Sequence, residues 1–245
     1  MRIGVAQIRL HDDLDKNLNH IKGWIQKAAD EGIDILAFPE TSLTGYLYEG
    51  FRRVKREDIE AAIDTLVDLT RKLKVSAVVG SPVWEEDRLF NSVVILLADG
   101  RRLLYHKNHL VDYEEEYFTP GKARLTFALG HLTFGTIVCR DQNFPELARS
   151  VREDGAQVLF ISCAHYYPPM EARWKVDKNR ALPIARACEN QIFVCLANSI
   201  GSSRGRINLG HSIIVGPNGV IIAEAGEGRE ELIAFDVDPL QQWRW

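Results

Sequence analysis

A short apolar run from Ile33 to Phe38, placed directly after a helix-like segment, constrains the fold of this chain more than any other feature. The run shows no regular alternation of polar and apolar residues, as expected for a strand buried on both faces. Apolar positions at helical spacing predict a helix over 13–31, which Gly32 ends. A helix over 57–72 followed by a strand over 76–80 repeats this order. The pattern predicts a sheet that helices cover.

Hairpins alternate with such helix–strand units along the rest of the chain. We expect helices at 145–153 and 174–190, and polar loops at 163–169 and 201–210. Because the sequence has no linker, repeat or low-complexity tract, we expect a single domain over 1–245, with a core of about 1–238 and a short C-terminal tail. The expected fold class is mixed α/β, with two sheets and helices outside them. Strands are expected at 2–8, 90–97, 102–106, 125–129, 132–138, 158–162, 192–198, 211–215, 220–224 and 232–236.

The charge and the cysteines exclude several classes of protein. A formal net charge of −4 and a pI of about 6.0 argue against a nucleic-acid-binding protein. No stretch of about 18 apolar residues could span a membrane, and the N-terminal residues lack the pattern of a signal peptide. The four cysteines form no CxxC pair. We therefore expect a cytoplasmic protein with reduced thiols, and neither nucleic acid nor membrane as a partner.

Cys139 is the strongest candidate for a nucleophile. It directly follows the predicted strand 132–138 and precedes the helix expected to begin at Pro145. A sharp strand-to-helix turn would expose the thiol, and N–H groups of the turn would stabilise both a thiolate and an oxyanion. The alternative is a cysteine that packs in the core as a small apolar residue.

Further polar residues follow predicted strands. Glu40 ends the strand 33–38, where apolar neighbours could raise the pKa of its carboxyl toward that of a general base. Lys107 ends the strand 102–106, and Glu114 lies in an acidic run. Each could instead be a capping or solvated side chain. Taken together, a carboxylate, a cation and a thiol supply the proton acceptor, oxyanion partner and nucleophile of an acyl transfer.

Motifs around these residues resemble the nitrilase superfamily of carbon–nitrogen hydrolases. The resemblance spans about residues 1–238, and its motifs follow the family's order. One departure is Arg140, because the family commonly has an aromatic or small residue after the cysteine. The matching segments are Phe38–Glu40, Tyr105–Leu110, Glu114 before the Phe118–Gly121 turn, Cys139–Glu146, Arg186–Asn190 and Gly210–Gly219.

This resemblance implies a four-layer α-β-β-α sandwich that pairs through helices, so a homodimer or higher homo-oligomer is expected. It implies hydrolysis of a non-peptide C–N bond of a small amide through a cysteine thioester, with release of ammonia and without a metal or organic cofactor. Glu40 would be the general base, Lys107 the oxyanion stabiliser and Cys139 the nucleophile. Glu114 would orient Lys107, and Arg140 would offer its backbone N–H to the oxyanion.

The predicted loop 163–169 should line the substrate pocket, because it leaves a strand end near Cys139. His165 and Tyr166 are its candidate substrate contacts, and its aromatic residues favour a small or partly apolar substrate. Arg173 could pair with a substrate carboxylate, as in an ω-amide or an N-carbamoyl acid, or be a surface residue at the start of a helix. The expected partner is a small amide or carbamoyl compound, with a nitrile as a further alternative.

Two other functions fit parts of the pattern. A glutaminase or protease could pair Cys139 with His165 or His211, and substitution of each histidine would test this hypothesis. A non-catalytic interaction protein could keep the fold alone. The presence of Glu40, Lys107 and Cys139 together argues against that second alternative.

Overall fold

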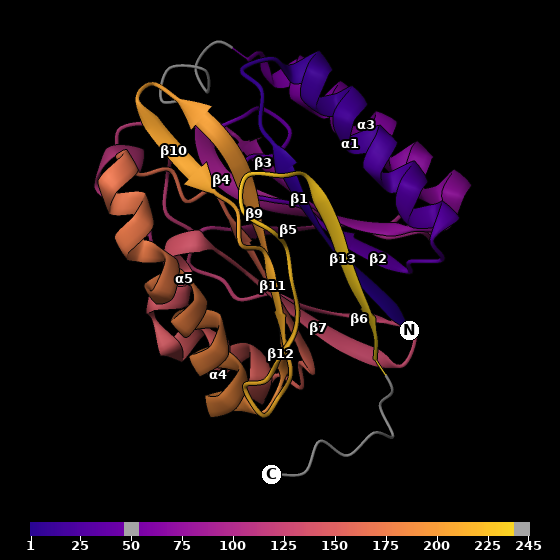
Figure 1. Cartoon of the computed structure of the whole chain (residues 1–245). Coiled ribbons are helices and arrows are strands. Elements are labelled where there is room, and N and C mark those ends of the chain that lie inside the picture. The colour runs from indigo at the N-terminus through magenta and orange to yellow at the C-terminus, as the bar shows by residue number, and fades with distance from the viewer. Residues whose placement is uncertain (47–53, 238–245) are drawn as a thin grey trace.

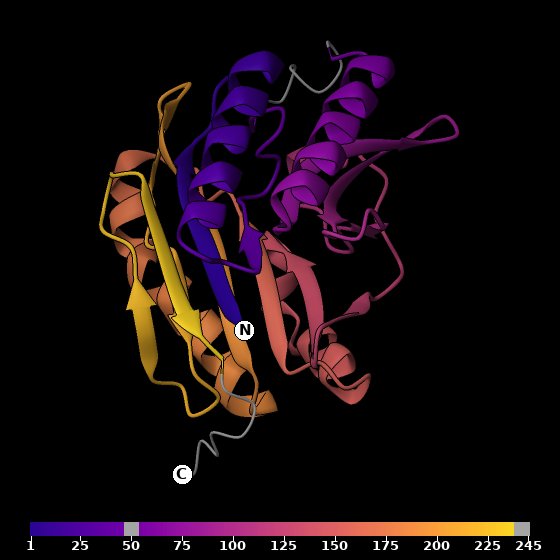
Figure 2. The same cartoon turned by 90° about the vertical axis from the view of Figure 1, so that its right-hand side faces the viewer.

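The computed structural model describes residues 1–46 and 54–237, so the expected C-terminal tail lies outside the described residues. Four layers are visible in Figures 1 and 2. Helices α1 (Leu14–Asp30) and α3 (Arg56–Leu73) cover one sheet. Helices α4 (Pro145–Glu153) and α5 (Pro169–Asn190) cover the other. Within the described ranges, no helix is long and apolar enough to cross a membrane.

The two sheets meet at one corner. The first has the order β5-β4-β3-β2-β1, with β13 antiparallel along β1, and the second runs from β6 through β7 and β8 to β9. Only the ends of β1 and β9 pair, at Ile8–Ser199 and Arg9–Ile200, so the sheets diverge from this corner and face each other. The strands are β1 (Arg2–Arg9), β2 (Ile35–Ala37), β3 (Ser76–Glu85), β4 (Arg88–Leu96), β5 (Arg102–His106), β6 (Thr126–Leu129), β7 (Leu132–Val138), β8 (Val158–Cys163), β9 (Phe193–Ser203), β10 (Arg206–Leu209), β11 (Ile213–Val215), β12 (Ile221–Glu224) and β13 (Glu231–Asp236).

The central strands of the first sheet are buried on both faces, as the sequence predicts. Ile35 and Ala37 of β2 belong to the core between the sheets, whereas Leu36 and Phe38 pack under α1 and α3. Successive side chains of a strand point to opposite faces, so an uninterrupted apolar run fills two cores at once. The expected α-β-β-α sandwich is therefore confirmed.

The segment 201–210 is not the polar loop that we expected. Strand β9 continues to Ser203 and pairs with β10, and only Arg204 and Gly205 form the turn. Both turn residues have positive φ, 48° and 74°, as in the two-residue turns that match the twist of a hairpin. The prediction is wrong because glycine and serine, although typical of loops, do not prevent the backbone of this segment from pairing.

Other boundaries differ by a few residues. Helix α5 begins at Pro169 rather than at 174, since a proline in the first helical turn loses no hydrogen bond. Strand β3 runs past Gly80 to Glu85 and forms a hairpin with β4, which begins at Arg88. Each extension lengthens an element without moving the strand ends at which the candidate residues lie.

Candidate active site

A buried ammonium group lies between two carboxylates where β2 and β5 end. Lys107 Nζ is 2.7 Å from Glu40 Oε1 and 2.8 Å from Glu114 Oε2, and the three side chains are at most 1% exposed. Glu40 follows β2, Lys107 follows β5, and Glu114 ends the short helix η1 (Asp112–Glu114). The structure thus brings together three of the residues that the sequence predicts for the site.

Asn91 fixes both carboxylates and was missed in the sequence. From the middle of the first sheet, its Nδ2 donates to Glu40 Oε1 at 2.8 Å and to Glu114 Oε1 at 3.1 Å. The backbone N–H groups of Ala164 and Val111 donate to the second oxygens of Glu40 and Glu114, at 3.1 Å and 2.9 Å. The one available signal was an amide within the otherwise mostly apolar strand β4. These donors hold each carboxylate in one orientation.

Cys139 begins the helix η2 (Cys139–Asn143) directly after β7. Its φ of +46° lies in the left-handed region, which costs a non-glycine residue free energy and often marks functional turns. Strands β7 and β8 pair in parallel with Val138 opposite Ser162, so the next residues, Cys139 and Cys163, follow side by side. The thiol of Cys139, a partly exposed residue, therefore has a second thiol as its neighbour.

The end of β8 connects Cys139 to the carboxylate cluster. The carbonyl of Cys163 accepts a hydrogen bond from the N–H of Glu40 at 3.4 Å, and the hydroxyl of Ser162 donates to the carbonyl of Phe38 at 2.9 Å. These contacts cross from one sheet to the other. Because Cys163 neighbours both Cys139 and Glu40, the thiol and the carboxylate share one site.

Electrostatic interactions favour a thiolate at Cys139. The pKa of Cys139 lies well below its ordinary value because the Cys163 thiol donates a hydrogen bond to it and Lys107 is positively charged, although burial opposes both. Burial, together with the charge of Cys139, raises the pKa of Glu40 well above its ordinary value. Burial alone would lower the pKa of Lys107, but Glu40 and Glu114 raise it. Both shifts therefore favour transfer of a proton from Cys139 to Glu40.

Asp141 ties the turn at Cys139 to the segment that carries Lys107. Its buried carboxylate accepts hydrogen bonds from the N–H of Val138 at 3.1 Å, the N–H of His109 at 2.8 Å and the hydroxyl of Tyr105 at 2.8 Å. The sequence placed Asp141 within a matching motif but gave no indication of this role. The carboxylate aligns two strand ends that belong to different sheets.

Of the expected substrate contacts, His165 and Tyr166 lie at the site. His165 is buried, and one of its ring nitrogens lies within 4.8 Å of the sulfurs of Cys139 and Cys163. The ring of Tyr166 stacks on Tyr46, with 6.2 Å between the ring centroids. Tyr46 in turn donates its hydroxyl to Glu114 at 3.0 Å.

The two arginine side chains bind protein groups instead. Arg140 donates to the carbonyl of Leu110 at 2.8 Å and approaches Asp112 at 3.3 Å. Arg173 forms two hydrogen bonds of 2.7 Å with Glu227, and its side chain is 61% exposed. Arg173 is therefore not brought into the buried cluster by any contact that the described residues show.

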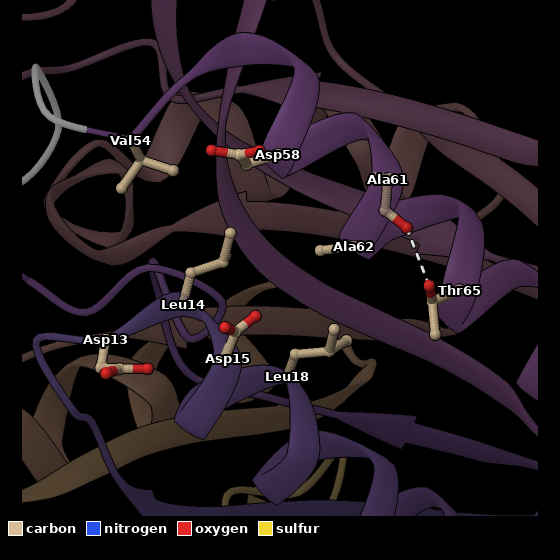
Figure 3. A pocket seen from close by; sticks show the side chains of 9 residues that line it. All are labelled: Asp13, Leu14, Asp15, Leu18, Val54, Asp58, Ala61, Ala62 and Thr65. Atoms are coloured by element: carbon tan, nitrogen blue, oxygen red, sulfur yellow. Dashed lines mark hydrogen bonds between the residues drawn. The ribbon is translucent and has the colours of Figure 1, made fainter.

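A separate cavity of about 560 Å³ lies between α1 and α3 (Figure 3). Asp13, Asp15 and Asp58 line it together with apolar side chains and Thr65, whose hydroxyl donates to the carbonyl of Ala61. No thiol or cation lines it among the described residues. It therefore offers neither a nucleophile nor an oxyanion partner, and the site at Cys139 is the better candidate.

Known proteins resemble the chain over nearly its whole length. The model of the carbon-nitrogen hydrolase family matches residues 2–244. The 2-oxoglutaramate amidase of Bacillus subtilis is 32% identical over 91% of this chain and 85% of that protein, and a nitrilase of Pyrococcus abyssi is 30% identical over 96% and 90%. A solved structure of a Nesterenkonia sp. AN1 amidase variant, with acrylamide added at the active-site cysteine, has a TM-score of 0.88 and 26% identity, covering 97% of this chain and 93% of that one. This protein therefore belongs to the carbon-nitrogen hydrolase family and hydrolyses carbon–nitrogen bonds other than peptide bonds.

Proposed function

We propose that this protein hydrolyses small primary amides that carry no charge. The products are the carboxylic acid and ammonia, and the reaction passes through a thioester on Cys139. The observation that carries the proposal is the buried Lys107 ammonium, which Glu40 and Glu114 hold beside the turn of Cys139. The amidase from Nesterenkonia sp. AN1, which resembles this chain, has been solved in complex with butyramide, and this supports the substrate class.

Acylation begins with the Cys139 thiolate. Its sulfur attacks the amide carbon, a C–S bond forms, and an electron pair of the carbonyl moves to the oxygen. Glu40 holds the proton that the thiol has lost, which agrees with the directions in which the two pKa values move. The Lys107 ammonium and the N–H of Arg140 stabilise the oxyanion, and loss of one such donor typically costs about 10²–10³ in rate.

The leaving group then takes the proton from Glu40. The C–N bond breaks, ammonia departs, and the acyl group remains on Cys139. Glu40, now a carboxylate, accepts a proton from the water that attacks the thioester, and the thiolate is released with the acid. Glu114 and Asn91 are positioning residues, since they hold Lys107 and Glu40 in place.

The surroundings favour an uncharged acyl group. Tyr46 packs edge-on against Tyr113 and stacks on Tyr166, with ring centroids 6.1 Å and 6.2 Å apart, so aromatic faces stand next to Glu114. Burial and the charge of Glu114 raise the pKa of Tyr46 well above its ordinary value. A field that disfavours a tyrosinate also disfavours a substrate carboxylate. Among the described residues, Arg140 and Arg173 already have acidic partners.

Ammonia release across a small panel tests the proposal. Butyramide and propionamide should be hydrolysed with kcat/KM at least about 10-fold above succinamate and N-carbamoyl-β-alanine, because an unpaired charge is costly to bury. Propionitrile tests the nitrile alternative and should be hydrolysed more slowly than either amide. Cys139→Ala should release no ammonia from any of them, and mass spectrometry of the wild type should detect the acyl adduct on the peptide that contains Cys139.

A preference for succinamate or the carbamoyl acid would contradict the substrate class and direct attention to Arg173. In that case Arg173→Gln should abolish the preference, and Glu227→Gln, which frees the guanidinium, should retain it. Residual amidase activity in Cys139→Ala would instead contradict the mechanism itself.

A second mechanism uses His165 as the base, and the closeness of its ring to Cys139 favours it. The two bases make different predictions. With Glu40 as the base, Glu40→Gln should abolish acylation, whereas His165→Asn should retain measurable turnover. The opposite result would assign the proton transfer to His165.

We also propose a homodimer. The family resemblance implies pairing through helices, and we infer that the helix is α5. Met170 and Trp174 lie one helical turn apart on this helix and are 66% and 72% exposed, a combination typical of contact surfaces.

The four free thiols support a cytoplasmic location, which fractionation of the native host would test. We further propose that the chain is a single domain, for which one cooperative unfolding transition is expected.

A further inference from the structure

The nucleophile proposed above lies in a cluster of three metal-ligating groups, two thiols and an imidazole. We propose that Cys139, Cys163 and His165 form a binding site for a thiophilic divalent cation such as Zn²⁺ or Cd²⁺, which occupies the nucleophile and stops hydrolysis. The inference needs only the two thiols and the imidazole, and it does not depend on which amide the protein hydrolyses.

The backbone places the two sulfurs side by side. Because Val138 pairs with Ser162 in the parallel ladder of β7 and β8, the residues that follow leave adjacent strands at the same level. One ligand atom from each of Cys139, Cys163 and His165 lies within 4.8 Å of the others. Zinc–sulfur bonds of about 2.3 Å and zinc–nitrogen bonds of about 2.0 Å in a tetrahedral site place ligand atoms roughly 3.5–3.8 Å apart. Small side-chain rotations would therefore close the site.

His165 provides an independent indication of a ligand. Its side chain is almost fully buried, at 5% exposure, yet Nδ1 has no hydrogen-bond partner among the described residues. Its Nε2 is 3.4 Å from Nε2 of Gln142, which also approaches the sulfur of Cys163 at 3.6 Å. A buried imidazole with so few partners loses little when it binds a cation. Asn198 accepts the backbone N–H of His165 at 3.1 Å and fixes the loop.

The charge of the neighbourhood allows a cation despite Lys107. The ammonium is already paired with Glu40 and Glu114, so these three groups together carry one negative charge when both carboxylates are ionised. On binding, two metal–sulfur bonds and one metal–nitrogen bond form, metal-bound waters leave, and the protons of the Cys139 and Cys163 thiols are released. Cys139 is partly exposed, so we expect a water molecule to take the fourth position on the cation.

Cobalt substitution tests the site without reference to activity. The reduced full-length protein, freed of reductant and chelator, is titrated with Co²⁺ and then with Zn²⁺ while the near-ultraviolet and visible spectra are recorded. We expect one Co²⁺ per chain with a sulfur-to-cobalt charge-transfer band and tetrahedral visible bands, and displacement of both by Zn²⁺.

Variants assign the ligands. Cys163→Ser and His165→Asn should each weaken Co²⁺ binding by at least about 10-fold, and Cys139→Ala should lose about half of the charge-transfer intensity. Cys188→Ser is the matched control, since this free thiol lies on α5 near Gly219, and its spectrum should equal that of the wild type. Circular dichroism checks that each variant is folded.

The outcomes separate this inference from the proposed function. A protein that hydrolyses amides but shows no charge-transfer band, or loses it in Cys188→Ser, overturns the metal site and leaves the hydrolase intact. A band that depends on Cys139, Cys163 and His165 supports the site even in a preparation without amidase activity. Zn²⁺ should then inhibit the active protein at the concentration that displaces Co²⁺.

Discussion

Lys107 is a charged side chain without access to water. Removing an ammonium from water costs several kcal/mol, and only close partners of opposite charge offset this cost. Glu40 and Glu114 supply that charge, and the amide nitrogen of Asn91 donates to both carboxylates, so the ammonium and both carboxylates have close partners. In the proposed mechanism this buried cation stabilises the oxyanion. Loss of one member of the cluster would leave the others buried without a partner and lower the free energy of unfolding.

Removing only the ammonium should therefore affect both rate and stability. Lys107→Met keeps the length and apolar stem of the side chain but leaves two carboxylates facing each other. We expect kcat for butyramide to fall by at least about 10²-fold and the free energy of unfolding to fall by about 3–5 kcal/mol. Ammonia release and urea titration measure the two effects.

Lys27→Met is the control for this substitution. Lys27 forms an exposed pair with Glu31 at 3.9 Å on α1, and such pairs contribute about 0–1 kcal/mol. The kcat of Lys27→Met for butyramide should equal that of the wild type. A Lys107→Met protein with nearly full kcat would show that other donors carry the oxyanion.

Strand ends and the turns after them set the geometry of the site at the scale of elements. Glu40, Lys107 and Cys139 follow β2, β5 and β7, and each position depends on how closely the next strand approaches. At Gly80, in β3, a Cβ atom would lie 2.3 Å from the carbonyl oxygen of Pro39 and 2.4 Å from the nitrogen of Thr41. Only glycine allows β3 to pass directly behind Glu40.

Gly80→Ala should displace the backbone of Glu40 while leaving every side chain of the proposed mechanism unchanged. We expect a loss of about 1–3 kcal/mol in the free energy of unfolding, because the added methyl group overpacks a rigid region. We also expect a fall in kcat that exceeds any change in KM, since the role that we propose for Glu40 is proton transfer. Steady-state kinetics and urea unfolding provide both numbers.

Gly23→Ala offers a matched comparison within α1. Nothing lies within 4 Å of a Cβ atom at this position, so the substitution should raise helix stability by about 0.5–1 kcal/mol and leave kcat unchanged. If Gly80→Ala left kcat unchanged, as is expected for Gly23→Ala, the close packing of β3 against Glu40 would not matter for activity.

At the scale of the whole molecule, residues from both sheets meet at one site. Helix α5 exposes two large apolar side chains on the outer surface. Contacts from β4 and β5 of the first sheet reach β7 of the second, which is how residues of both sheets meet. On the outer surface, Trp174 and Met170 of α5 expose large apolar side chains without a described partner that buries them.

Trp174→Glu should weaken the proposed dimer. A tryptophan at the centre of an interface often contributes 2 kcal/mol or more, so the dissociation constant should rise by at least about 30-fold. Light scattering over a dilution series measures this change. Val220→Glu is the control, because Val220 is also exposed but lies in the turn between β11 and β12, and it should leave the assembly unchanged. A wild-type protein that is monomeric at every concentration would contradict the dimer.

The sequence by itself determined which segments are buried strands and which residues end them. Apolar periodicity and turn residues reflect interactions between near neighbours in the chain, so Glu40, Lys107 and Cys139 could be placed at strand ends without coordinates. The boundaries of β3, β9 and α5 were missed because pairing and a first-turn proline extend elements beyond their clearest pattern.

Only the tertiary structure decided which of these ends share a site. Asn91 bridges Glu40 and Glu114 because three segments distant in sequence bury their polar groups together. Cys163 stands beside Cys139 because β7 and β8 pair in one particular register. Register and burial depend on contacts between segments far apart in the chain, and a one-residue shift would turn every side chain of a strand to its other face. Local sequence patterns do not show which register two distant strands adopt.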